Sequence, residues 1–293
     1  KKRGRLIGIR NSIGGAIAFL CGLALIWMLS TFAFPLNYAL AFFCGFAFMM
    51  ASVIVQSNLV EEEPSKVVAK RPLGGYLRGL PGVFRHNKRF RWFILMSSFL
   101  VVANMPMGFF TVYAMKSFGG GESLVGQFTL AMVAIQVVSA FANGYIADHY
   151  GHKVALIVAA SGMLCASVCA VLAPSLGWFM LVYVFLGVNL GSELMLRYNM
   201  SIEYGPVEQR STYVGLMNTA LAPFYLSSIA AGWISDQFGY HTVFALGALF
   251  SVVGIALLVV RVEDPHRYSS LSPRMEPAAT DGTLKELSMT SEQ

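Results

Sequence analysis

The stretch Gly144-Tyr-Ile-Ala-Asp148-His-Tyr-Gly151-His-Lys153 lies between two apolar runs, each long enough to cross a lipid bilayer. It places an acid, two glycines and a base in the short connection between those runs. A glycine lets two backbones approach where a side chain would clash. Gly144 and Gly151 therefore predict a tight hairpin between two membrane helices.

The rest of the chain extends this pattern over its whole length. Of its 293 residues, 56% are hydrophobic and only 12% are charged, and the mean hydropathy is +0.62. Apolar runs of about 18 residues or more recur throughout, which predicts an all-α, polytopic membrane protein rather than a soluble domain. The eight expected transmembrane helices are residues 11–33, 35–57, 91–114, 124–147, 154–174, 178–201, 212–235 and 242–262.

The positive charges agree with one orientation of these spans. If the hairpin at Gly144–Lys153 is cytoplasmic, the lysines and arginines of the predicted loops fall on the cytoplasmic side, and Lys116 alone remains on the opposite side. This asymmetry follows the positive-inside rule and predicts that both ends of the chain are cytoplasmic. The net charge of +6 is then a topology signal, and we expect no nucleic-acid partner.

The cysteines give no sign of a metal or a disulfide framework. All four fall inside predicted spans. Cys165 and Cys169 share a helix face at i, i+4, but no His, Asp or Glu lies near them on that helix. We therefore expect packing roles for the cysteines, with no metal site and no cofactor.

Four residues of the hairpin carry a family resemblance. Gly144, Asp148, Gly151 and Lys153 match the spacing of the G-x-x-x-D-x-x-G-x-K loop motif. The stretch resembles the motif of the major facilitator superfamily, found between the second and third helices of each six-helix half. The resemblance implies a multi-pass transporter, such as those of prokaryotic inner membranes, that works by alternating access.

A second resemblance follows the sixth predicted span. Glu203, Pro206 and Arg210 resemble the E-x-x-x-P-x-x-x-R stretch after the tenth helix of the family, with the proline one residue early. The family's pattern implies that Glu203 and Arg210 form a cytoplasmic charge relay with Asp148.

An internal repeat indicates where this chain belongs in such a fold. The triplet Arg3, Gly8 and Asn11 recurs with the same spacing between Arg210 and Asn218. Two parallel six-helix halves build the family's fold, so we expect helices five to twelve here, with four helices missing upstream. The predicted parts are residues 1–60 (end of the first half), 61–90 (a cytoplasmic linker with an interfacial helix), 91–265 (the second half) and 266–293 (a disordered cytoplasmic tail).

One polar stripe lies inside the predicted membrane region. Asn189, Glu193 and Arg197 follow one another at i+4 spacing on one helix face. Placing an ionisable side chain near the centre of a membrane helix costs about 2.5–3.5 kcal/mol of free energy. The presence of such a residue therefore requires a structural or functional explanation. The stripe is either a structural ion pair that orients the helix or a binding site for solute or protons.

A second candidate region lies in the third span. Pro106 removes a backbone hydrogen bond and breaks or kinks the helix just after Asn104. Phe109, Phe110 and Tyr113 follow the break. They are either a packed aromatic cluster or the lining of a cavity for a moderately apolar ligand.

Together these features favour a secondary active transporter of a small organic solute, with efflux favoured over uptake and protons as the candidate coupling ion. A sugar or metabolite permease of the same fold is the alternative, and a non-transporting receptor or scaffold in the bilayer stays open. An enzyme is not expected, because the histidines lie in or beside loops and Glu193 is the single acid well inside a predicted span.

Overall fold

The computed structural model describes residues 2–58, 87–119, 123–205 and 209–263. All the regular structure within these ranges is helical, which confirms the all-α prediction. Most of the predicted linker at 61–90, including its interfacial helix, and the tail at 266–293 lie outside the described residues. The helices are α1 (Lys2–Thr31), α2 (Leu36–Ser57), α4 (Lys88–Ala103), α5 (Met107–Phe118), α6 (Ser123–Tyr150), α7 (His152–Leu172), α8 (Leu176–Leu190), α9 (Glu193–Glu203), α10 (Arg210–Tyr225), α11 (Ser227–Phe238) and α12 (Tyr240–Val260).

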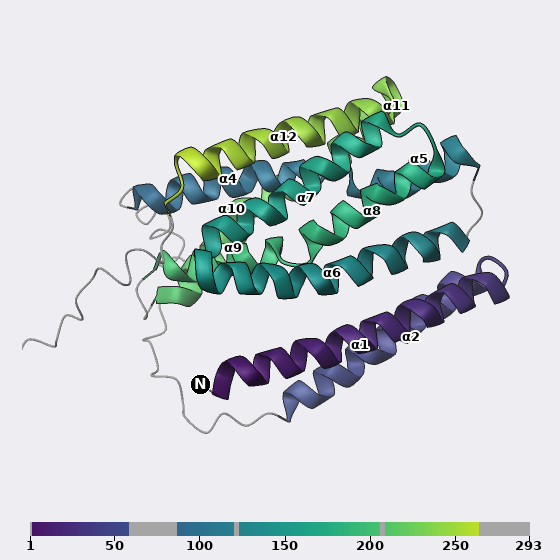
Figure 1. Cartoon of the computed structure of the whole chain (residues 1–293), viewed down its shortest axis with the longest axis horizontal. Helices are drawn as coiled ribbons and strands as arrows, with labels where there is room; N and C mark the ends of the chain where they lie inside the picture. The colour runs from purple at the N-terminus through teal and green to yellow at the C-terminus, as the bar shows by residue number, and fades with distance from the viewer. Residues whose placement is uncertain (1, 59–86, 120–122, 206–208, 264–293) are drawn as a thin grey trace, which may run out of the picture.

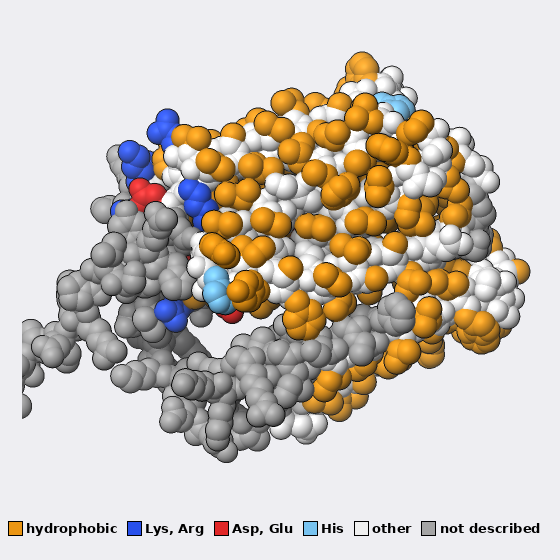
Figure 2. Space-filling model, in the orientation of Figure 1, with side chains coloured by type: hydrophobic (Ala, Val, Ile, Leu, Met, Phe, Trp, Pro, Cys, Tyr) orange, Lys and Arg blue, Asp and Glu red, His pale blue; other side chains and the backbone are white. Residues whose placement is uncertain are grey.

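The helices have the length and polarity that a bilayer requires. Seven helical segments of the described residues are long and apolar enough to span a membrane, and Leu20–Thr31 at the end of α1 is a shorter apolar segment. Figure 2 shows a surface dominated by apolar side chains, with the charged ones gathered at the end where α4 begins and α12 ends. This distribution is typical of a protein whose sides face lipid.

Three of the predicted spans each run as two helices. α4 and α5 are separated at Asn104–Pro106, α8 and α9 at Gly191–Ser192, and α10 and α11 at Leu226. The sequence predicted the first break from Pro106 but treated the other two spans as continuous. Pro223 lies inside α10, three residues before the third break, and its missing N–H leaves the carbonyl oxygen of Thr219, one turn earlier, without its usual helical donor.

The helices run roughly side by side along the long axis of the molecule (Figure 1). α1 and α2 form a hairpin, and α1 packs along α6 at the edge of the other helices. The contact is close at Gly126 of α6, where an added Cβ would lie 2.8 Å from Cγ1 of Ile26. α2 packs on α1. The most apolar stretch of α2 is long enough to span a membrane, and none of its residues is buried in this structure.

The connection between α6 and α7 is tighter than the sequence predicted. α6 ends at Tyr150 and α7 begins at His152, so Gly151 is the turn, with φ of 91°. A side chain is strained in that conformation, so glycine is required there. The prediction for Gly144 was wrong: it lies within α6, and an added Cβ would meet no other side chain or neighbouring backbone within 4 Å.

α8 lies directly against the backbone of α6. A Cβ added to Gly187 would lie 2.5 Å from the carbonyl oxygen of Met132, and one added to Gly191 would lie 2.7 Å from that of Gln136. Small residues of this kind let membrane helices pack closely. This contact sets the position of the α8–α9 break relative to α6.

We expect Gly187→Ala to lower the thermal stability of the protein in detergent by about 1–3 kcal/mol, because the new methyl group overlaps a backbone carbonyl that cannot rotate away. Gly177→Ala is the matched control on the same helix, since an added Cβ there meets nothing within 4 Å. Equal melting temperatures for the two variants would contradict the close α6–α8 contact.

Candidate functional site

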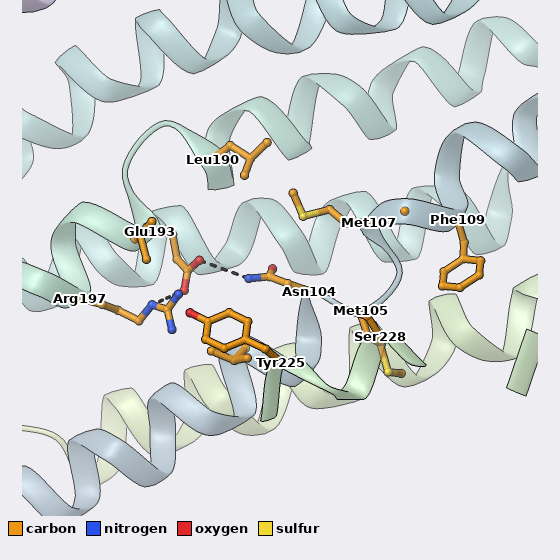
Figure 3. Close-up of a pocket in the computed structure, with 12 residues that line it drawn as sticks. Asn104, Met105, Met107, Phe109, Leu190, Glu193, Arg197, Tyr225 and Ser228 are labelled. Atoms are coloured by element: carbon orange, nitrogen blue, oxygen red, sulfur yellow. Dashed lines mark hydrogen bonds and ion pairs between the residues drawn. The ribbon is translucent and has the colours of Figure 1, made fainter. Parts of the chain in front are cut away.

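The three helix breaks meet around one cavity of about 520 Å³. Each break lies near the middle of its span, the depth at which transporters of broken-helix design bind their solutes. Figure 3 shows side chains from all three breaks facing this space. The lining residues are Val101, Asn104, Met105, Met107, Gly108 and Phe109 from the first break, Leu190, Glu193, Leu194 and Arg197 from the second, and Tyr225 and Ser228 from the third.

The only charged residues in this lining are Glu193 and Arg197. Nε of Arg197 lies 2.8 Å from Oε1 of Glu193, and the two residues are 3% and 4% exposed. Glu193 is the first residue of α9, where the positive end of the helix dipole stabilises a carboxylate. The ion pair that the sequence suggested is therefore present, and it is part of the cavity wall.

Asn104 extends this pair across the cavity. Its Nδ2 donates a hydrogen bond of 3.3 Å to Oε2 of Glu193, so Glu193 lies between Arg197 and Asn104 (Figure 3). The carboxylate fixes the orientation of the amide, because an amide oxygen in that place would face another acceptor.

Apart from the two atoms that form the ion pair, two buried polar atoms at the site are without a hydrogen-bond partner among the described residues. They are Oδ1 of Asn104, an acceptor, and Nη1 of Arg197, a donor. Buried polar groups are normally satisfied, so unpaired ones in a cavity wall mark where a ligand or water binds. The cavity wall therefore holds a guanidinium nitrogen and an amide oxygen that both lack a hydrogen-bond partner among the described residues.

Asn189, the third member of the predicted stripe, does not line the cavity. It is buried between helices, and its Nδ2 donates a hydrogen bond of 3.1 Å to the carbonyl oxygen of Ala159 on α7. Its amide joins two helices, which is a common use of asparagine in membrane bundles.

The predicted aromatic candidates separate in the structure. Phe109 lines the cavity, whereas Phe110 and Tyr113 are buried in an aromatic cluster against which Phe109 also packs. The rings of Phe110 and Phe244 have centroids 5.1 Å apart, and the hydroxyl of Tyr113 lies 3.1 Å from Nε2 of His241. This cluster packs α5 against α8 and α12.

The loop motif makes different contacts from those that the family pattern implies. Lys153 donates a hydrogen bond of 2.9 Å to the carbonyl oxygen of Val259, at the end of α12. Glu203 lies 3.5 Å from Nδ1 of His152. Asp148 is exposed, and no ion pair within the described ranges joins it to Arg210. The relay through Asp148 stays a prediction.

Sequence reasoning missed the contribution of the third break. Tyr225 and Ser228 line the cavity, but neither was a candidate. Pro223, one turn before the break at Leu226, was the available signal, because a proline inside a membrane helix often marks a discontinuity.

Comparison with known proteins supports the resemblance. A family model described as the Major Facilitator Superfamily matches residues 1–224 and, in a second match, 92–289. The chain therefore belongs to the major facilitator superfamily, and its membrane helices make it an integral, multi-pass membrane protein.

Several curated relatives are similar to it. The 4-hydroxybenzoate transporter PcaK of Pseudomonas aeruginosa is 24% identical over 188 residues, 61% of this chain and 41% of the relative. The gallate transporter of Pseudomonas putida is 24% identical over 196 residues (65% and 43%), and the niacin transporter NiaP of Acinetobacter baylyi is 20% identical over 151 residues (51% and 34%). The chain spans about two fifths of the length of the first of these. The family and these transporter-named relatives indicate that the chain is not an enzyme.

We expect Glu193→Ala to destabilise the folded protein by roughly 3 kcal/mol, because it leaves the guanidinium of Arg197 buried without its counter-ion. The double variant Glu193→Ala/Arg197→Met removes both charges and should recover part of that loss. Thermal unfolding in one detergent measures all three proteins. A double variant less stable than the single one would show that the pair is not electrostatically coupled.

Proposed function

We propose that this protein is a secondary active transporter of small aromatic carboxylates, and that the cavity between the three helix breaks binds the solute. The observation that carries the proposal is the buried guanidinium of Arg197, a residue of the cavity wall, whose Nη1 has no hydrogen-bond partner among the described residues. A carboxylate is the ligand group that completes it, through charge-assisted hydrogen bonds.

The cavity walls suit the remainder of such a solute. Phe109, Tyr225, Met105 and Met107 offer aromatic and thioether surfaces on which a flat ring packs. Three relatives are named for transport of 4-hydroxybenzoate, gallate and niacin, each a small ring that carries one carboxylate. The chemistry of the site and the names of the relatives therefore agree.

Glu193 gives the site a means of coupling to protons. A solute carboxylate that binds Arg197 comes close to the carboxylate of Glu193, and two like charges repel each other unless one of them takes up a proton. We propose Glu193 as the proton carrier, with Asn104 donating to its second oxygen. Solute and proton would then bind together.

The proposed cycle is alternating access, and it involves more helices than this chain contains. The chain spans about two fifths of the length of its first relatives. The apolar stretch of α2 that is long enough to span a membrane has no buried residue. An exposed apolar face of this kind suits either lipid or further helices, so the four helices upstream of Lys1 stay a prediction from the sequence. Efflux, the location in a prokaryotic inner membrane and the cytoplasmic placement of both termini stay predictions from the sequence.

We expect Arg197→Met in the full-length protein to reduce binding of 4-hydroxybenzoate roughly tenfold to a hundredfold, the usual effect of losing a hydrogen bond to a charged partner. Arg197→Lys keeps the charge but loses the guanidinium fork, so it should restore binding only in part. Equilibrium binding of radiolabelled 4-hydroxybenzoate measures both variants.

Arg89→Met is the control, because Arg89 is half exposed and pairs with Glu263 outside the cavity. Transport of the same compound into cells and into inverted vesicles, with and without a proton gradient, gives direction and coupling. Binding that is unaffected by Arg197→Met would overturn the proposed site, and binding without transport would favour a receptor.

A further inference from the structure

The short helix α9 carries both charged residues of the cavity and contacts the α6–α7 hairpin at both of its ends. It has 11 residues, with Glu193 at its first position and Glu203 at its last. α9 is a separate helix from α8, and besides packing along its sides on α7 and α10 it is held at both of its ends.

The first end is tied to α6 through a buried polar network. Nδ2 of Asn143 donates to Oγ of Ser192 at 2.7 Å and to Oγ of Ser139 at 3.0 Å. Oγ of Ser139 in turn donates to the carbonyl oxygen of Val188 at 2.9 Å. One asparagine of α6 therefore connects the last turn of α8 with the first residue before α9.

Ser192 is an unusual N-cap residue. It stands at the N-cap of α9, but its side chain makes no capping hydrogen bond to that helix. Its hydroxyl accepts from Asn143 instead, and Asn143 is 1% exposed. The start of α9 is thus held by a neighbouring helix rather than by its own cap.

The second end contacts the start of α7. Oε1 of Glu203 lies 3.5 Å from Nδ1 of His152, the residue directly after the turn at Gly151. Asn143, in turn, directly precedes Gly144, the first residue of the loop motif. The two ends of α9 are therefore joined to the two sides of one hairpin, one contact directly before the motif and the other within it.

We infer that α9 couples the α6–α7 hairpin to the solute cavity, so that a conformational change at one of them alters the conformation of the other. The inference rests on the proposed function for the cavity. A movement of the hairpin displaces α9 at both ends and with it Glu193 and Arg197. Because binding linkage is reciprocal, a solute on Arg197 must then alter the hairpin in return. Asn143 is the positioning residue of this connection.

Hydrogen exchange of the full-length protein in lipid nanodiscs tests the connection without a ligand. Asn143→Ala removes two buried hydrogen bonds, so amides in residues 190–197 should exchange about tenfold faster than in the wild type. Gln136→Ala, which removes an amide side chain two turns earlier on the same helix, is the matched control. Equal exchange of residues 190–197 in the two variants would overturn the inference.

The second experiment repeats the hydrogen exchange with saturating 4-hydroxybenzoate and measures the exchange rates of amides in residues 144–153. The inference predicts slower exchange of this hairpin in the wild type and no such effect in Asn143→Ala/His152→Ala. It is wrong if the compound protects the cavity but leaves the hairpin unchanged, or if the hairpin effect survives in the double variant. If the compound does not bind the wild type at all, the proposed function fails, while the ligand-free arm still decides whether Asn143 holds α9.

Discussion

The structure depends on the ion pair between Glu193 and Arg197. Charges at the depth of the hydrocarbon region are tolerated when they pair with each other or face a cavity inside the protein, and this pair does both. The same condition applies to broken helices, whose freed backbone groups need partners from protein or water. The ion pair and the three helix breaks have the same requirement, so they occur together. Between them lies a cavity with polar side chains inside an apolar helix bundle.

Close packing then determines how this cavity is held. Gly187 and Gly191 bring α8 against the backbone of α6, and Asn143 closes the contact with hydrogen bonds just where α8 ends. A helix of 11 residues, α9, continues from there with both charges on its first two turns. The charged residues of the cavity and their connection to the α6–α7 hairpin thus involve the same few residues. The route that we propose between the loop motif and the solute cavity runs through these residues.

Local sequence signals predicted part of this. Seven of the eight predicted spans follow from apolar length, the first break from Pro106, and the ion pair from the i, i+4 spacing of Glu193 and Arg197. These features depend on residues close in sequence, where helix geometry fixes what can meet. The break at Gly191–Ser192 was not predicted, because glycine and serine are also common inside continuous membrane helices.

The roles of single side chains depended on tertiary contacts that periodicity does not contain. Phe109 and Phe110 are adjacent, yet one lines the cavity and the other is buried in the aromatic cluster. Asn189 shares a face with Glu193 in the sequence pattern, but it bonds α7, while Asn104 reaches Glu193 from 89 residues away.

The most direct test of this account is an experimental structure of the full-length protein with 4-hydroxybenzoate bound. The account predicts the carboxylate of the compound within hydrogen-bond distance of the Arg197 guanidinium, with its ring between Phe109 and Tyr225. A compound bound elsewhere, with the cavity empty and the Arg197–Glu193 contact as it is here, would contradict it.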